Sequence, residues 1–137
     1  MHEVIHARGH EHVRAEHAST FEVTTDDYLT PAGDCILAVE ADRAPADFDP
    51  AFVEACQEAE ATITVTIEAD GHRESVTGRG DPDLEFTSER SAVGRTSDYV
   101  DDRTILVGAE FAAEGFDRDL VAALSEGCEA TMTISVE

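Results

Sequence analysis

The sequence contains no lysine and no tryptophan, and its nine basic residues are all arginine. Against them stand 31 acidic residues, which gives a formal net charge of −22. Self-repulsion of this size weakens a compact fold in dilute buffer, whereas at molar salt the Debye length falls to roughly 3 Å and screens it. Arginine without lysine fits the same setting, because arginine forms defined bidentate contacts with carboxylates. We therefore expect a cytoplasmic protein of a halophile that accumulates salt.

Several other features are scarce or missing. No apolar run approaches the ~18 residues of a membrane span, and no glycine-rich phosphate loop occurs. The sequence also lacks the basic stripe and aromatic run of a nucleic-acid-binding module, so neither nucleic acid nor membrane is an expected partner. The cysteines number only three, without metal-type spacing, which favours reduced thiols. The apolar share of 42% is ordinary and strongly periodic, which excludes an acidic disordered chain.

Two units of similar sequence, residues 3–68 and 71–137, follow one another along the chain. Identities recur in the same order in both units, with Arg8-Gly9, Thr25-x-Asp27-Tyr28 and Phe48-Asp49 matching Arg79-Gly80, Thr96-x-Asp98-Tyr99 and Phe116-Asp117. Half of the chain alone would expose a sheet face and unpaired strand edges. We therefore expect one domain over residues 1–137, built by internal duplication.

Alternating residues predict the clearest strands. Apolar residues alternate with threonines over Ala61–Glu68, and the same pattern returns over Ala130–Glu137, which indicates antiparallel sheet with one wet face. Thr20–Thr24 alternates as well, with Phe21 and Val23 directed inward. The near-continuous apolar runs Cys35–Val39 and Thr104–Val107 are typical of central strands. The link Ala69-Asp70-Gly71 is expected to be a turn.

One short helix is expected in each unit. Asp49 is a good N-cap and Pro50 suits the first helical position, and Asp117 repeats the cap in the second unit. Gly127 provides a C-terminal stop for the second helix. Each unit is then strands plus one helix, and the two units, related by pseudo-symmetry, form a mainly β (α+β) domain. A single β-sandwich or a closed barrel, including one of double-psi type, satisfies this pattern.

The N-terminal region gathers histidines. As zinc ligands, three or four of them would need to converge as neutral imidazoles. On a strand, His10 and His12 would share one face, and His17 would not lie on it. A helix would align the histidines differently, but Gly9 disfavours a helix here. His10, His12 and His17 thus remain weak metal candidates beside the simpler interpretation of solvated or structural histidines.

A polar site could also form without a metal. His10, His17 and Glu22 are the candidates for acid–base chemistry, although no nucleophile motif accompanies them. Were residues 11–16 and 20–25 a hairpin, Arg14 would instead face Glu22 as a cross-strand ion pair.

The arginines are the second group that could bind a ligand. Thr20, Arg95 and Arg103 are candidates for holding an anionic group of a small molecule. The simpler alternative is that each arginine pairs with a neighbouring acid, because acids are in large surplus.

Two motifs resemble an archaeal family called domain of unknown function 371. The first runs Arg8-Gly9-His10-Glu11-x-Val13-x-x-x-His17-x-x-Thr20-x-Glu22-Val23-Thr24, followed by Leu29-Thr30-Pro31-x-Gly33-Asp34-Cys35-Ile36; the second is Arg95-x-Ser97-Asp98-Tyr99-x-x-x-Arg103-Thr104-x-x-Val107. The resemblance covers essentially the whole chain and implies a small, mainly β protein with no assigned activity, and the sequence identifies no cofactor. The family tends to carry lysine before each helix, where this chain has Arg43 and Phe111, and often a second histidine, where it has Asp81. A function that needs two symmetric sites is therefore not expected.

Two functions follow as hypotheses. One is a domain that binds a small ligand, and that could also catalyse a reaction on it, with its site around the N-terminal motif; in that case the motif side chains should converge. The other is a non-catalytic interaction or scaffold domain, in which case the motif residues are structural and a surface or strand edge should suit a partner. The sequence names neither a substrate nor an oligomeric state.

Overall fold

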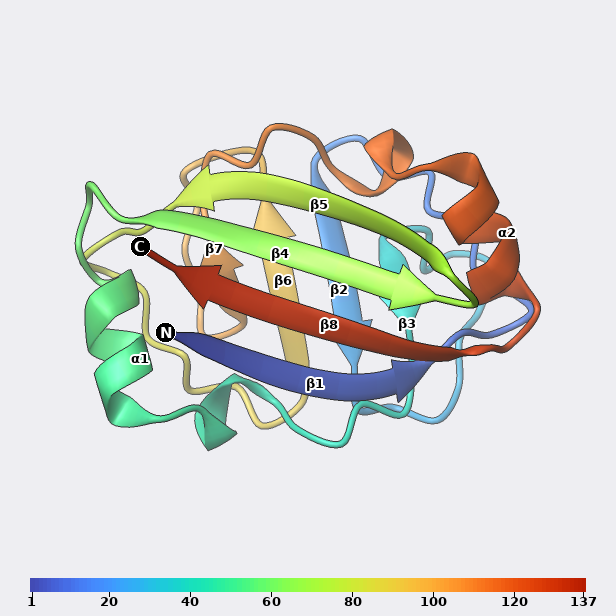
Figure 1. Cartoon of the computed structure of the whole chain (residues 1–137), viewed down its shortest axis with the longest axis horizontal. Coiled ribbons are helices and arrows are strands. Elements are labelled where there is room, and N and C mark those ends of the chain that lie inside the picture. The colour runs from blue at the N-terminus through green and yellow to red at the C-terminus, as the bar shows by residue number, and fades with distance from the viewer.

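A computed structural model describes all residues, 1–137, and shows two four-stranded sheets and two short helices (Figure 1). The strands are β1 (His2–Arg8), β2 (Thr20–Thr24), β3 (Ile36–Ala38), β4 (Thr62–Ala69), β5 (His72–Arg79), β6 (Ser91–Arg95), β7 (Thr104–Leu106) and β8 (Glu129–Val136). The helices are α1 (Pro50–Cys56) and α2 (Arg118–Ser125), each preceded by a 3-10 turn, η1 (Pro45–Asp47) or η2 (Ala113–Gly115). The protein is therefore mainly β, as the alternating segments predicted.

The same order of elements occurs twice, three strands, a 3-10 turn, a helix and a strand. The first sheet has the order β1-β8-β4-β5 and is antiparallel throughout; the second has the order β3-β2-β6-β7. Each unit gives two strands to each sheet, and β1 pairs with β8 of the other unit. Neither half could complete a sheet alone, because the central pairs β4–β8 and β2–β6 each join the two units.

The two sheets lie face to face, with the strands of one running steeply across those of the other (Figure 1). No closed barrel forms, so of the two architectures expected from the sequence the layered, sandwich-like one fits. The helices lie at opposite ends of the layers. No helix is long and apolar enough to cross a bilayer.

The prediction that Cys35–Val39 and Thr104–Val107 form central strands is wrong. β3 and β7 are the two edges of the second sheet, and each runs parallel to its only neighbour. Their residues are apolar because loops and the other sheet bury them, and all of β7 is buried. A continuous apolar run indicates that both faces of a strand are buried. An edge strand can also be buried on both faces when loops cover it.

Caps define both helices as the sequence predicted. The Asp49 side chain accepts a hydrogen bond from the Ala51 amide at 2.8 Å, and the Asp117 side chain accepts one from the Leu120 amide at 3.1 Å. Gly127 has φ +81° just after α2, which provides the left-handed residue that ends a helix. Asp70 and Gly71, with φ of 49° and 80°, form the tight turn of the β4–β5 hairpin.

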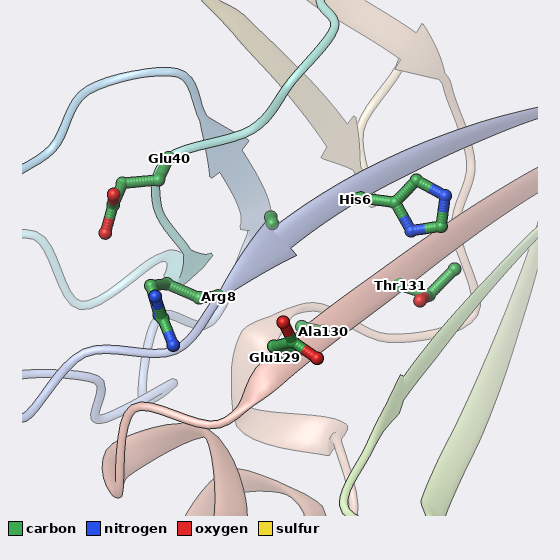
Figure 2. A pocket seen from close by; sticks show the side chains of 7 residues that line it. His6, Arg8, Glu40, Glu129, Ala130 and Thr131 are labelled. Atoms are coloured by element: carbon green, nitrogen blue, oxygen red, sulfur yellow. The ribbon is translucent and has the colours of Figure 1, made fainter.

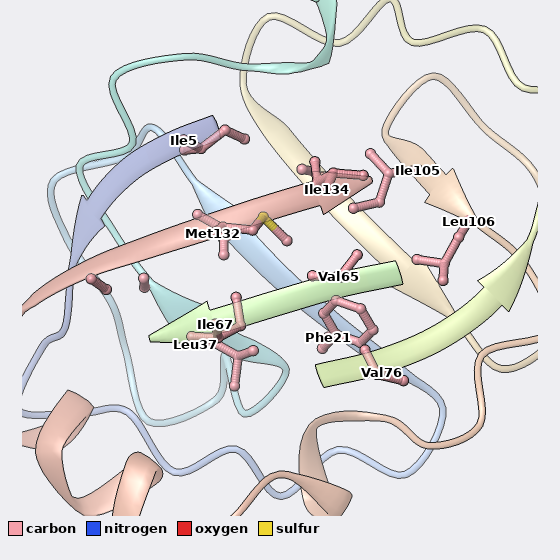
Figure 3. Packing of buried hydrophobic residues seen from close by; sticks show 14 of the residues in the cluster. Ile5, Phe21, Leu37, Val65, Ile67, Val76, Ile105, Leu106, Met132 and Ile134 are labelled. Carbon is pink, nitrogen blue, oxygen red and sulfur yellow. The ribbon is translucent and has the colours of Figure 1, made fainter. Parts of the chain in front are cut away.

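Figure 3 shows the core between the sheets, where side chains from both layers interdigitate. Phe21 of β2 is fully buried, and its ring packs against Phe116 with centroids 5.3 Å apart. Gly94 of β6 leaves room for that ring, since a Cβ there would lie 2.2 Å from Phe21 Cζ. The glycine in this strand is therefore a packing requirement.

The repeated Arg-Gly pair has a structural cause that joins the units. Gly9 lies directly against the C-terminal end of α2, where a Cβ would lie 1.8 Å from the Leu124 carbonyl oxygen. Gly80 lies in the same way against α1, with a Cβ only 2.2 Å from the Cys56 carbonyl oxygen. Each unit therefore provides the glycine against which the helix of the other unit packs.

Candidate functional site

Polar residues gather on the side of the second sheet that faces away from the core. Thr20 and Glu22 alternate along β2 with the buried Phe21 and Val23, so they point outward. Arg95 of β6 stands opposite Thr20 in the register. With neighbours from the adjoining loops they form what we call the Glu22 cluster: Thr20, Glu22, Cys35, Arg95, Asp101 and Arg103.

Arg95 is the most buried charge in the cluster, with 8% of the residue exposed. Its Nε donates to Thr104 Oγ1 and its Nη2 donates to Asp101 Oδ2, both at 2.9 Å. The guanidinium carbon lies 4.8 Å from the ring centroid of Tyr99, which is otherwise exposed. Arg95 is thus held on three sides by groups of its own unit.

Asp101 links the two arginines. Its Oδ2 accepts from Arg95 and also from Arg103 Nη2 at 3.0 Å, and its Oδ1 accepts from the Arg103 amide at 3.0 Å. Desolvation opposes ionisation of Asp101, but the hydrogen bonds from Arg103 and the charge of Arg95 outweigh it and lower its pKa to about 2. Partial burial acts against the charge of Arg103, yet its hydrogen bond to Asp101 raises the pKa of the guanidinium. Both partners stay charged at every physiological pH.

Glu22 is bonded much less completely. Its side chain is 14% exposed, and its only hydrogen-bond donor is the Cys35 thiol, with Sγ 3.7 Å from Oε1. The nearest guanidinium nitrogen, Arg103 Nη1, lies 4.0 Å away, which is beyond hydrogen-bond distance. No buried polar side-chain atom of the protein lacks a partner, so the Glu22 oxygen that accepts no protein hydrogen bond is open to solvent, and Glu22 is the member of the cluster with the fewest protein bonds to its charge.

The cluster contains no activated nucleophile. Burial, together with the nearby Glu22 carboxylate, raises the pKa of the Cys35 thiol to about 11. Burial raises the pKa of Cys56 to about 12. All three cysteines are free. Because the thiolate is the reactive form, the geometry favours binding over covalent chemistry.

His17 lies at the start of β2 beside the cluster. Its Nδ1 accepts hydrogen bonds from the amides of Ser19 at 3.2 Å and Thr20 at 3.1 Å. The neutral ring therefore carries its proton on Nε2, the nitrogen left to meet a ligand. Thr20 Oγ1 also lies 3.1 Å from Nδ1, so two candidates that the sequence named separately, His17 and Thr20, are in direct contact.

His10 lies elsewhere, in the loop that follows β1. Its amide donates to the Leu124 carbonyl at the end of α2, and its Nδ1 accepts from the His12 amide at 3.0 Å. The rings of His10 and His12 are neighbours, with centroids 5.3 Å apart, but no third ligand joins them and His17 is not part of the pair. The motif therefore divides into His17, Thr20 and Glu22 on one side and His10 with His12 on the other.

The predicted hairpin of residues 11–16 with 20–25 does not form. Residues 9–19 are a loop, and β2 pairs with β3 and β6 instead. Arg14 is exposed and Glu22 faces Arg103, so the expected Arg14–Glu22 pair is wrong. The sequence could not single out Asp101, because an acid two residues before an arginine is common in a chain with 31 acids.

The surface hollows are shallow and lie away from the histidine loop. The one in Figure 2, of about 330 Å³, lies across β1 and β8 and is lined by His6, Arg8, Thr131 and the exposed acids Glu40 and Glu129. Two carboxylates flank Arg8 there, which offsets its attraction for an anion. Neither His10 nor His17 lines any hollow.

Together these features define a small, mainly β domain with a polar cluster on one sheet. The family model for a domain of unknown function, DUF371, matches residues 5–137, so the chain belongs to that family. It is also similar to the uncharacterized protein MJ0206 of Methanocaldococcus jannaschii, with 38% identity over 133 residues, 97% of this chain and 98% of that protein. Neither match names an activity.

Proposed function

We propose that this protein is a non-covalent binding domain for a small polar anion, and that Glu22 and Arg103 form the centre of its site. The under-bonded Glu22 carboxylate carries the proposal. A ligand with a hydroxyl or amine beside a carboxylate or phosphate would donate to Glu22 and accept from Arg103 Nη1, which lie 4.0 Å apart. Thr20 shares the outward face of β2 with Glu22, and His17 contacts Thr20.

Two features support binding at this point over a purely structural role. Arg103 retains an exposed side chain, 42% accessible, while its Nε and Nη2 are fixed by Asp101. Arg95 and Asp101 are thereby a rigid support that holds the free Nη1 in place, as preorganised sites require. The raised thiol pKa values support a binding role without a covalent step.

An NMR titration with lactate, a small 2-hydroxycarboxylate, tests the site. The amides of Thr20 and Glu22 and the Nε of Arg103 should shift in the wild type at high salt, and Glu22→Gln should weaken binding by about tenfold or more. Glu89→Gln, at an exposed acid outside the cluster, is the matched control and should bind normally. Shifts spread over the surface, or equal binding by Glu22→Gln, would refute the proposal.

Native mass spectrometry with elemental analysis gives an independent test. Protein purified without an affinity tag in high salt should carry a small anionic molecule and no stoichiometric metal. A bound metal would instead favour the histidine interpretation of the motif.

The second candidate is the interaction or scaffold domain, and the mutual satisfaction of Arg95, Asp101 and Arg103 favours it. On that view Glu22 is also structural, and Glu22→Gln should destabilise the fold.

We further propose a cytoplasmic, salt-adapted protein that arose by internal duplication; the −22 charge and the repeated element order support this.

A further inference from the structure

The loop that joins the first two strands of one unit has the same backbone conformation as its counterpart in the other unit. We call residues 9–19, between β1 and β2, the histidine loop; residues 80–90, between β5 and β6, are its counterpart. A buried residue at the same place in each loop has a left-handed backbone, Ala15 with φ 49° and Phe86 with φ 52°. The two loops differ in the side chains that hold this conformation.

The first difference lies directly after the glycine of each loop. In the histidine loop, His10 Nδ1 accepts a hydrogen bond from the His12 amide at 3.0 Å. In the counterpart loop, Asp81 Oδ1 accepts one from the Asp83 amide at 2.8 Å. Aspartate commonly forms this turn, in which a side chain bonds to the backbone two residues further on. His10 forms the same turn with a ring nitrogen.

The second difference lies at the end of each loop, just before β2 and β6. His17 Nδ1 accepts hydrogen bonds from the amides of Ser19 at 3.2 Å and Thr20 at 3.1 Å. Ser88 Oγ accepts from the amides two and three residues further on, both at 3.1 Å. The same two caps therefore hold both loops, and only in the histidine loop are both acceptors imidazole nitrogens.

Protonation affects these two kinds of acceptor differently. An imidazole nitrogen accepts a hydrogen bond only while it carries no proton, and both ring nitrogens of an imidazolium are donors. A protonated ring would therefore direct an N–H at the amide N–H groups that now donate to it. The hydroxyl of Thr20 can rotate to accept from such a ring, but a backbone amide cannot. The oxygens of Ser88 and Asp81 keep acceptor lone pairs throughout the range in which histidine changes charge.

Charged groups on four segments surround His17. They are Glu16 in the loop, Asp34 ahead of β3, Glu114 of η2 and Arg95 of β6. The Asp34 carbonyl accepts from the His17 amide, and the Glu114 amide donates to the His17 carbonyl. No carboxylate lies within 4.0 Å of a ring nitrogen of His17. In this conformation no ion pair would replace the bonds that protonation removes.

The surroundings of His10 add a second obstacle to its protonation in this conformation. The ring of His12, itself titratable, lies with its centroid 5.3 Å away, so protonation of both rings would place two cations side by side. Glu11 lies 3.9 Å from His12 Nε2. At the adjoining end of α2 the charged groups are Glu126, at its C-cap, and Arg8, whose Nε donates to the carbonyl just beyond it.

We propose that the histidine loop is a proton-dependent switch, held in place while His10 and His17 are neutral and released when they are protonated. Its counterpart in the second unit lacks this dependence. The stabilisation by the two histidine caps is therefore present at about pH 8 and is lost as the pH falls toward about 5. Release frees Thr20, a member of the Glu22 cluster. An effect on ligand binding rests on the proposed function, but release of the loop does not.

The test compares cleavage of the two loops by a glutamyl endopeptidase at molar potassium chloride. Each loop contains two exposed glutamates, Glu11 and Glu16 in one and Glu85 and Glu89 in the other. Peptide mass spectrometry gives the ratio of the two cleavage rates in one sample, divided by the same ratio for the two loop peptides in isolation. This division removes the pH dependence of the protease. The corrected ratio should rise at least about tenfold from pH 8 to pH 5, because the lost caps open only the histidine loop.

The chain itself provides the matched variant. His10→Asp combined with His17→Ser places the caps of the second unit in the histidine loop, so its corrected ratio should stay within about twofold between the two pH values. His17→Asn keeps an acceptor oxygen that does not titrate, and by itself it should reduce the rise in cleavage after Glu16. It provides a test that does not depend on folding of the double variant. His6→Gln, at an exposed histidine on β1, is the control and should keep the full rise.

A constant ratio in the wild type, or an equal rise in the double variant, would overturn the proposal. So would loss of the rise in His6→Gln. None of these outcomes depends on lactate binding, so the switch and the proposed function can fail separately.

Discussion

Asp101 Oδ2 accepts a hydrogen bond from Arg95 Nη2 at 2.9 Å, and this contact fixes the most buried arginine of the protein. The same carboxylate holds Arg103, so one acid positions both candidate ligand-binding arginines. Substitution of Asp101 should therefore disturb the positions of both arginines.

Asp101→Asn should lower the free energy of unfolding by about 1–3 kcal/mol, since it leaves two guanidinium groups with a neutral partner. Denaturant unfolding at molar salt measures this. Asp102→Asn, at the exposed neighbour, is the control and should change stability by less than about 0.5 kcal/mol. Equal effects of the two substitutions would contradict the arrangement described.

The stabilising effect of Asp101 should depend on pH. Its pKa is lowered to about 2 in the folded protein from 3.8, so its contribution is present above pH 3.8 and is lost as the pH falls toward 2. The stability difference between wild type and Asp101→Asn should shrink over that interval. The measurement belongs at molar salt, where general charge repulsion is screened. A difference that stays constant from pH 5 to pH 2 would argue against the lowered pKa.

Glu22→Gln separates the two candidate functions by stability alone. If the under-bonded carboxylate serves a ligand, the neutral amide should leave stability within about 0.5 kcal/mol of wild type or increase it, because binding sites often sacrifice stability. If Glu22 is structural, the variant should be less stable by about 1 kcal/mol or more. Thermal unfolding in the absence of ligand distinguishes the two results.

The thiols of Cys35 and Cys56 should react slowly. With pKa values raised from 9.0 to about 11 and about 12, the thiolate fraction at pH 8 falls by two orders of magnitude or more. Alkylation by iodoacetamide, followed by peptide mass spectrometry, should be at least about 100-fold slower in the folded protein than in urea. A Cys35 rate close to the unfolded rate would instead indicate a reactive thiol in the cluster.

Salt should stabilise the fold. With a net charge of −22, raising potassium chloride from millimolar to molar should add about 2 kcal/mol or more, which corresponds to roughly 5–10 °C in the midpoint of thermal unfolding. Sucrose at matched osmolality is the control, because it is excluded from the protein surface but does not screen charge. It should raise the midpoint of thermal unfolding less than potassium chloride does. Equal rises in both solutions would show that repulsion is not the cause.

Local chemistry allowed the sequence to predict several strands and both helices, but it gave no range for β1, β5 or β6. Thr20–Thr24 is β2 residue for residue, and the caps at Asp49 and Asp117 begin the two helices. Alternation and capping act within a few residues, so they can be read without the fold. The repeated Arg-Gly pair was visible too, although only the structure shows that each glycine seats the other unit's helix.

Pairing between distant segments decided what the sequence left open. Phe111 in place of the charge at Arg43 stood out in the sequence, but only the topology shows that β1 and β5 are the two borders of the first sheet. His10 was separated from His17 because the loop between β1 and β2 packs on α2 rather than forming a hairpin. Glu22 met Arg103, 81 residues away in the chain, because β2 and β6 pair across the two units. The sequence by itself determined the clearest strands, the caps and the charge. Tertiary packing decided the order of the strands and which polar groups became neighbours, since contacts between distant segments depend on the whole topology.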